Sequence, residues 1–286
     1  MPGNTPVLMI LTSHRLDCFS LCLQCLEWFT DLDAFARIYV LANEVDPVHH
    51  QAIRDFKARR PRGQVAELHC APRARGDNPC LRAMWNEVLA RHKNDILVKL
   101  DEDVFVTPGW LPRLLDAFAR HADDDTLLVS PLVPNTDLGR TFLDGFLRAQ
   151  WPGEFAGAVA ATPVYANGDY GAWIWDKVLN HDLLGRFRAH GHAPGMFLPG
   201  LSINCIVFGP LLTNLIFPLA ANDEFTINHL LERGGMRGWM EASAVAHHYS
   251  FYRQQAAVDA AVSLDAVRLH LARQTSPRAA RAAEAA

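Results

Sequence analysis

The sequence is short of lysine, and it has no large excess of charge of either sign. Lysine occurs only as Lys57, Lys93, Lys99 and Lys177. The formal net charge of the 286 residues is -4, so no overall positive charge draws the chain toward nucleic acid. Half of the residues are hydrophobic and a fifth are charged, which excludes a chain that is disordered throughout. We therefore expect a globular protein that binds no nucleic acid.

Features of an exported protein are also missing. The apolar run at residues 6–11 is too short for the hydrophobic part of a signal peptide, and no basic residue precedes it. Six cysteines in a chain of this length indicate free thiols in a reducing compartment rather than a disulfide framework. The expected location is therefore the cytoplasm.

One long stretch, residues 201–221, has no charged residue. A run of about 18 or more apolar residues is the usual sign of a transmembrane helix. Pro210 and Pro218 would interrupt such a helix, and several polar side chains would enter lipid with it. We predict instead a buried strand, followed by a short helix that starts at Gly209 and Pro210. No transmembrane segment is expected, and peripheral contact with a membrane stays open.

Three cysteines follow the spacing by which radical-SAM enzymes hold an iron–sulfur cluster. Cys18, Cys22 and Cys25 form a C-x3-C-x2-C pattern. At about 100° per residue they fall on one face of a helix, together with Phe29. Thiolates that hold a cluster converge from a loop instead, and this segment has no glycine to form one. We predict that the cysteines pack in the core, and an iron–sulfur enzyme remains an alternative.

Apolar runs alternate with amphipathic stretches through the first half of the chain. The runs lie at residues 7–11, 36–41, 64–70, 95–100 and 126–133. Such alternation predicts an α/β fold, in which a mostly parallel sheet carries helices on both faces. After the fourth run, Thr107 is a suitable N-cap and Pro108 suits the first helical position, so we predict a helix from Pro108 to about Phe118.

The alternation stops after Asn135. Residues 136–200 mix glycine, proline and many aromatic residues with little periodicity, so we place an insertion or binding region there. The aromatic residues are Trp151, Phe155, Tyr165, Tyr170, Trp173 and Trp175. Rings of this kind can stack on sugars, with Asn167 and Asp169 as neighbouring polar groups, but clustered rings more often form a core.

A pair of carboxylates closes the fourth apolar run. In Asp101-Glu102-Asp103, the two aspartates lie two residues apart, so on an extended segment their side chains point to the same side. Two carboxylates in so small a space favour a cation between them, and the carboxyl ends of parallel strands are where α/β sheets bind ligands. Mg²⁺ or Mn²⁺ bridging a diphosphate would satisfy both conditions, whereas a solvated acidic loop is the plainer explanation.

With its neighbours, this pattern resembles that of a family 2 glycosyltransferase, over roughly residues 7–251. Enzymes of this class use nucleotide-diphosphate sugars and invert the anomeric carbon, and the resemblance rests on several motifs in the same order. It implies the GT-A fold, a Rossmann-like, mostly parallel nucleotide-binding sheet with helices on both faces and an aromatic-rich acceptor region.

The resemblance implies donor-binding residues after the first two strands, before and within the third helix, and in the acidic motif. These are Thr12, Ser13, Arg15, Asn43, Glu44, Arg75, Asn78, Asn86, Asp101 and Glu102. Arg73 is a further candidate for the phosphates, because guanidinium groups are planar bidentate donors. The implied cofactors are Mn²⁺ or Mg²⁺, with the nucleotide sugar as donor substrate.

Two later segments carry the remaining implied roles. The segment at 220–239 resembles the helix that carries the catalytic base in this family. Asp223 or Glu224, near the helix N-terminus, would be that base. Gly234 and Gly235 would end the helix. A second segment, which contains His247 and His248, would supply a histidine ligand to the metal. The implied metal ligands are Asp101, Asp103 and either His247 or His248.

The predicted organisation is a single domain over residues 1–274. Its parts are a nucleotide-sugar-binding half at 1–135, an acceptor-binding and catalytic-base half at 136–253, a C-terminal helix at 254–274 and a mobile tail at 275–286. The implied activity is transfer of a hexosyl or related group from a nucleotide sugar, with UDP favoured, to a hydroxyl of a glycan or glycolipid in polysaccharide biosynthesis. A nucleotidyltransferase and a non-catalytic nucleotide- or carbohydrate-binding module remain open.

Overall fold

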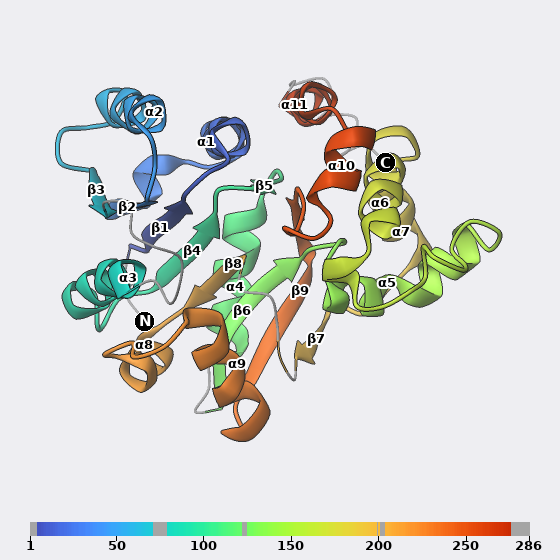
Figure 1. Cartoon of the computed structure of the whole chain (residues 1–286). Helices are drawn as coiled ribbons and strands as arrows, with labels where there is room; N and C mark the ends of the chain where they lie inside the picture. Colours follow the sequence, from blue (N-terminus) through green and yellow to red (C-terminus); the bar gives the residue numbers. More distant parts are fainter. Residues whose placement is uncertain (1–4, 71–78, 122–124, 199, 201–203, 276–286) are drawn as a thin grey trace.

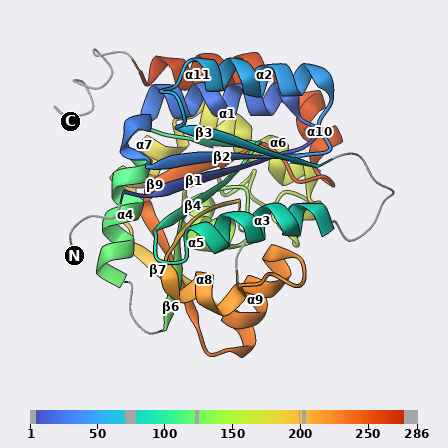
Figure 2. The same cartoon turned by 90° about the vertical axis from the view of Figure 1, so that its left-hand side faces the viewer.

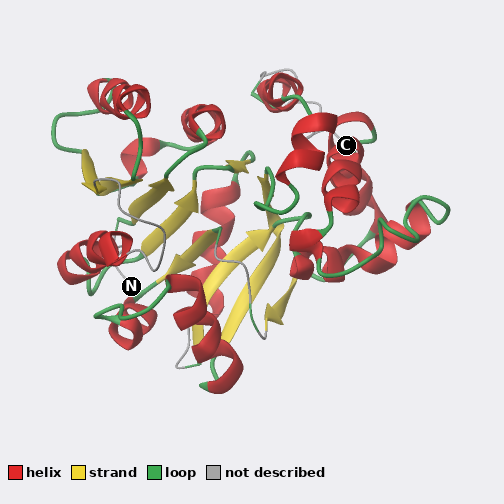
Figure 3. Ribbon diagram, viewed as in Figure 1, coloured by secondary structure: helices red, strands yellow, loops and turns green. Residues whose placement is uncertain are grey.

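The computed structural model describes residues 5–70, 79–121, 125–198, 200 and 204–275. Within these ranges, nine strands form one sheet in the order β3-β2-β1-β4-β8-β6-β9-β5, with β7 paired to β9. Helices lie on both faces of the sheet (Figure 1, Figure 3). The predicted α/β class is therefore confirmed, and both halves of the chain contribute strands to the same sheet.

The first half of the chain forms the parallel part of the sheet. Its strands are β1 (Val7–Thr12), β2 (Arg37–Asn43), β3 (Val65–Cys70) and β4 (Leu97–Asp101), and β1 pairs in parallel with both β2 and β4. Its helices are α1 (Leu16–Phe29), α2 (Pro47–Ala58) and α3 (Pro79–Arg91), with a short 3-10 turn η1 (Leu32–Ala34). Helices α1 and α2 cover one face and α3 covers the other (Figure 2). Burial on both faces explains why β1, β2 and β4 are mostly apolar, whereas β3 lies at the edge of the sheet and is only partly buried.

The strands after β4 make the sheet mixed rather than purely parallel. Strand β8 (Cys205–Phe208) pairs antiparallel with both β4 and β6 (Thr126–Leu132), and β6 pairs in parallel with β9 (Arg237–His248). Strands β5 (Val104–Val106) and β7 (Gly195–Leu198) pair antiparallel with β9. Because β4 and β6 are both antiparallel to β8, the strands β1, β2, β3, β4, β6 and β9 all end at one edge.

The helix after the acidic motif starts later than predicted. Helix α4 spans Trp110–His121, not Pro108 onward. Gly109 has φ +73°, outside the helical region, and the Thr107 hydroxyl donates to the Val245 carbonyl instead of capping the helix. Residues 104–106, which were not predicted as a strand, form β5 because β9 offers them a pairing edge.

The aromatic-rich region folds as a helical layer beside β9. It contains α5 (Asp137–Gln150), a short 3-10 turn η2 (Val164–Ala166), α6 (Gly168–Asn180) and α7 (Leu183–His190). Most of its rings are buried, namely Trp151, Phe155, Tyr170 and Trp175, whereas Tyr165 is exposed. Asn167 caps α6, accepting from the Tyr170 backbone N–H. The rings therefore act mainly as core, as predicted for clustered rings.

The C-terminal region forms two helices where one was predicted. These are α10 (Gln255–Ala261) and α11 (Leu264–Arg273). Ser263 caps α11 by accepting from the Asp265 backbone N–H, which interrupts the helix between them. The predicted mobile tail lies, from residue 276, outside the described residues.

The uncharged stretch and the cysteine motif follow their predictions. The stretch forms β8 and then α8 (Pro210–Ile216), with Gly209 as N-cap. No helix in the described ranges has the length and apolar character needed to cross a membrane.

Cys18, Cys22 and Cys25 are buried free thiols on α1. Burial raises the pKa values of these thiols, which disfavours the thiolates that an iron–sulfur cluster requires.

Candidate active site

The acidic motif lies in the turn between β4 and β5. Asp101 ends β4, and Glu102 and Asp103 form the turn before β5. Val104 of β5 pairs with His248 of β9, so β9 brings its last residue beside the motif. The His248 Nε2 and Asp103 Oδ2 atoms lie 3.2 Å apart. Burial raises the pKa of Asp103, but His248, a backbone hydrogen bond and Lys99 together outweigh burial, so the pKa lies below the ordinary value.

The two adjacent histidines point to opposite sides of β9, as neighbours on a strand do. His247 packs against the Trp175 ring, with centroids 5.4 Å apart. Burial lowers the pKa of His247 to about 3, and its Nε2 has no hydrogen-bond partner. The side chain beside Asp103 is therefore that of His248.

Asp101 pairs with a buried lysine. The Lys99 Nζ lies 2.6 Å from Asp101 Oδ1, and Lys99 is 2% exposed. Burial raises the pKa of Asp101 to about 7, against the opposing effect of Lys99, and the carboxylates of Asp103 and Asp223 raise it further. Sequence reasoning assigned no role to Lys99, although a lone lysine between apolar residues of a predicted strand is a detectable signal.

Glu102 is bonded to the loop that follows β1. Its carboxylate accepts five hydrogen bonds there, from the Thr12 and Ser13 hydroxyls and from the backbone N–H groups of Ser13, His14 and Arg15. This loop leads into α1, whose N-terminus favours an anion. The protein's own carboxylate therefore bonds to the loop that the resemblance assigns to donor binding.

The other predicted donor residues of the first loop also have protein partners. The buried Thr12 hydroxyl lies 2.6 Å from His49 Nε2, in addition to its bond to Glu102. Arg15 forms ion pairs with Asp17 and with Asp259 of α10, and its guanidinium lies 5.2 Å from the centre of the Tyr249 ring. Arg15 thus joins the first loop to the C-terminal region.

The remaining predicted donor residues that the structure describes lie in two places. Asn43 ends β2 and Glu44 follows it at the same sheet edge, and Glu44 has φ 59°. Asn86 of α3 holds the backbone of Leu219, since its Oδ1 accepts from the Leu219 N–H and its Nδ2 donates to the Leu219 carbonyl. Arg75 and Asn78, with Arg73, lie outside the described residues.

The Asn86 contact positions the start of α9 (Asp223–Arg233). Asn222 caps this helix by accepting from the Phe225 backbone N–H, and α9 ends at Gly234 and Gly235 as predicted. Asp223 is buried, whereas Glu224 faces a cavity. Burial and the neighbouring Asp223 raise the pKa of Glu224, and Lys99 and His248 oppose that rise. The base candidates therefore lie in the same electrostatic environment as the acidic motif.

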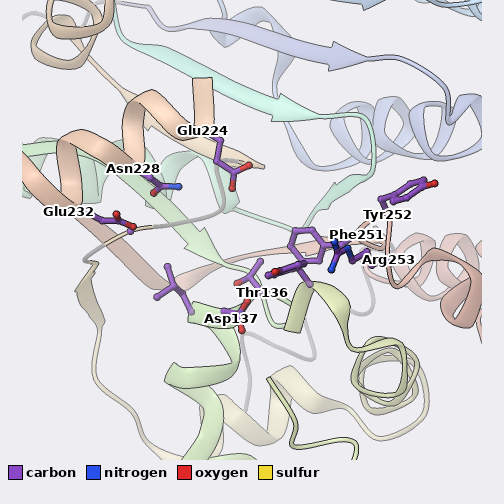
Figure 4. Close-up of a pocket in the computed structure, with 11 residues that line it drawn as sticks. Thr136, Asp137, Glu224, Asn228, Glu232, Phe251, Tyr252 and Arg253 are labelled. Atoms are coloured by element: carbon purple, nitrogen blue, oxygen red, sulfur yellow. The ribbon is translucent and has the colours of Figure 1, made fainter. Parts of the chain in front are cut away.

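The cavity beside Glu224 has a volume of about 690 Å³ and is called the α9 cavity below. It lies between α9, the start of α5 and the segment after β9 (Figure 4). Its polar and aromatic lining comprises Thr136, Asp137, Tyr165, Glu224, Asn228, Glu232, Phe251, Tyr252 and Arg253. Of these, only Tyr165 and Glu224 were singled out from sequence. Thr136 and Asp137 could have been found, because they follow an apolar strand that ends at the ligand-binding edge.

The residues beside the motif fit a hard divalent cation only in part. No group of three or more His, Cys, Asp or Glu side chains in the described part of the chain could hold a metal ion. Asp103 and His248 supply one carboxylate and one imidazole, and His248 Nδ1 has no hydrogen-bond partner. Mg²⁺ and Mn²⁺ commonly keep waters and take substrate phosphates as their other ligands, so two protein ligands suit a cation that binds together with a diphosphate.

Comparison with known proteins supports the fold. No protein-family model matches the sequence, and no curated protein is similar to it. The mannosyltransferase PcManGT from Pyrobaculum calidifontis, solved with GDP-Man and Mn²⁺, is 14% identical, with a TM-score of 0.50 over 85% of this chain and 56% of that one. GalNAc-T7, solved with UDP, GalNAc and Mn²⁺, is 11% identical, with a TM-score of 0.52 over 88% of this chain and 45% of that one.

This chain thus spans about half the length of each of these two structures. At such identities the likeness concerns the arrangement of helices and strands, and it carries no activity with it. Together with the sheet order and the helices on both faces, it shows that the chain has the GT-A fold.

Proposed function

We propose that this protein is a metal-dependent glycosyltransferase. It would move a sugar from a nucleotide-diphosphate sugar, with UDP as the favoured nucleotide, to a hydroxyl of a glycan in polysaccharide biosynthesis, inverting the anomeric carbon. The observation that carries the proposal is the position of Glu224. It lines the α9 cavity while sharing its electrostatic surroundings with Lys99 and with His248, the partner of Asp103.

In this proposal Asp103 and His248 hold the cation, and Asp101 contacts the ribose or a water on the metal. The contact between Asp103 and His248 supports their role, whereas His247 lies on the opposite side of β9. When bound, Mn²⁺ or Mg²⁺ would neutralise charge on the departing diphosphate. Lys99 keeps Asp101 in place from within the sheet.

The base would be Glu224 rather than Asp223. A general base must reach the hydroxyl that it deprotonates, and Glu224 faces the cavity while Asp223 is buried. A raised pKa also makes Glu224 a stronger base than an ordinary glutamate. An acceptor hydroxyl in the cavity would lose its proton to Glu224 and attack the anomeric carbon from the face opposite the diphosphate.

Some of the predicted donor residues would hold the first loop in place, and others would contact the donor. Glu102, Thr12, Ser13 and Arg15 would hold the first loop in place, since their polar atoms bond within the protein. Asn43 and Glu44 at the end of β2 would contact the nucleotide base.

A thermal-shift screen of nucleoside diphosphates with and without Mn²⁺ tests the donor class, because a ligand that prefers the native state stabilises it. We expect UDP to raise the melting temperature only with Mn²⁺. Incubation with UDP-sugars and a glycan panel, followed by NMR of the new anomeric proton, tests transfer and inversion. If no nucleoside diphosphate stabilises the protein and no nucleotide sugar is consumed, the proposal is wrong. Binding without turnover would indicate a non-catalytic module.

A further inference from the structure

The charged side chains around the α9 cavity are mostly acidic. Among the described residues of its lining, Asp137, Glu224 and Glu232 carry carboxylates, and Arg253 is the single guanidinium. Arg253 lies over the Tyr165 ring, with its Cζ 5.8 Å from the ring centre, which gives its charge a partner within the wall. A ligand in the cavity therefore meets a negative surface.

The carboxylates lie on two facing walls. Glu224, Asn228 and Glu232 follow one another at four-residue spacing along one side of α9, and Asp137 lies across the cavity at the start of α5 (Figure 4). Asp137 is held there because its Oδ1 accepts from the Val164 backbone N–H at 2.8 Å. A ligand between these walls is close to acidic groups on either side, so the charge of the ligand strongly affects its binding.

Aromatic residues also line the same cavity, and two of their rings are exposed. Tyr252 is 88% exposed and Tyr165 is 44% exposed, although large rings usually contribute by burial. Phe251, the chain neighbour of Tyr252, also lines the cavity. Rings that are left open beside hydrogen-bonding carboxylates and amides suit a sugar, which offers an apolar face and a rim of hydroxyl groups.

We propose that the α9 cavity is the acceptor site and that it selects by charge. It would take an uncharged or amino-bearing sugar and exclude a sugar that carries a phosphate or a carboxylate. The carboxylates accept hydrogen bonds from hydroxyl and ammonium groups, and they repel anions brought into contact with them. This inference rests on the proposed function, because it identifies the cavity beside Glu224 as the place of the acceptor.

Direct binding of matched sugars tests the selectivity without turnover. The probes are methyl glucoside, methyl glucosaminide, methyl glucuronide and methyl glucoside 6-phosphate, followed by their galacto and manno counterparts. Binding is measured by saturation-transfer NMR on the full chain, with UDP and Mg²⁺ present. We expect the neutral and amino sugars to bind and the two anionic sugars of the same series to bind at least about tenfold more weakly.

Substitution of Glu232 tests whether the wall causes the difference. Glu232→Gln should reduce the discrimination against anionic sugars, and Glu232→Lys should reverse it in favour of the phosphate. The matched control is Glu87→Gln, a surface glutamate on α3 paired with Arg91, which should leave the preference unchanged. Raised salt should weaken binding of the glucosaminide to the wild-type protein, because salt screens the attraction between its ammonium group and the carboxylates.

The outcomes separate this inference from the proposed function. If an anionic sugar binds as well as its neutral counterpart, or if Glu232→Lys leaves the preference unchanged, charge selection is wrong. If no sugar in any series binds while Mn²⁺ and UDP still stabilise the protein, the acceptor site lies elsewhere and the donor proposal stands. If UDP does not bind at all, the proposed function itself fails.

Discussion

Asp103 and His248 are the side chains on which the proposed cation site depends. We expect His248→Gln to abolish most of the Mn²⁺-dependent stabilisation by UDP, with at least about a tenfold loss of affinity, because half of the protein ligands would be missing. Thermal shift over a Mn²⁺ titration measures the effect. His247→Gln is the matched control, since His247 faces Trp175 on the other side of β9. Equal loss in both variants would contradict the assignment.

Glu224 is tested by its effect on rate rather than on binding. We expect Glu224→Gln to lower kcat on the order of 10²-fold or more while UDP and Mn²⁺ still stabilise the protein. Asp223→Asn is the comparison, and the larger kcat loss identifies the base.

The pH dependence of the same reaction gives a second measure of Glu224. The base must be ionised, so kcat/KM falls as the pH drops through its pKa, and burial raises that pKa above the ordinary glutamate value. The acid limb of the wild-type profile should therefore lie at higher pH than the pKa of an ordinary glutamate predicts. It should disappear from the residual activity of Glu224→Gln.

At the scale of the element, the β1–α1 loop depends on Glu102. Glu102→Gln keeps the shape of the side chain but removes the negative charge that five donors share. We expect a loss of about 1–3 kcal/mol in the free energy of unfolding, because hydrogen bonds to charged groups are the stronger ones. Urea unfolding followed by circular dichroism measures it. Glu87→Gln on the surface of α3 should change stability by less than about 0.5 kcal/mol.

Helix α9 is positioned by α3 through Asn86. Asn86→Ala removes both hydrogen bonds to Leu219, four residues before Asp223, so the helix start loses its anchor. We expect kcat to fall by about tenfold or more, since small misplacement of catalytic groups is costly, while the affinity for UDP changes little. Asn180→Ala on the surface of α6 is the control, and its kinetic constants should match those of the wild type.

At the scale of the whole molecule, the packed core controls the reactivity of the thiols. Cys18, Cys22 and Cys25 lie on the face of α1 that packs into the molecule, whereas Cys80 is half-buried. We expect a disulfide reagent to modify Cys80 first in the native protein and to reach the three α1 cysteines only on unfolding. Mass spectrometry of tryptic peptides over time resolves the order. Fast native labelling of Cys22, or iron and visible absorbance in anaerobically purified protein, would favour the iron–sulfur alternative.

The sequence by itself determined the features that depend on neighbours along the chain. Its apolar runs located β1, β2, β3, β4, β6 and β8, because a buried strand or helix face must repeat with its own period. Local chemistry also predicted the glycines that end α9 and the buried face of Cys18, Cys22 and Cys25, and the acidic motif lies at a strand end as expected.

Only the tertiary structure decided which of these residues meet. The pairing of β5 with β9 brings His248 rather than His247 to Asp103, and the turn after β4 turns Glu102 toward the first loop. The α9 cavity joins side chains from Thr136 to Arg253 that no spacing connects. Contacts between segments far apart in the sequence depend on which strands pair and in which register, and a local pattern does not specify the pairing partner.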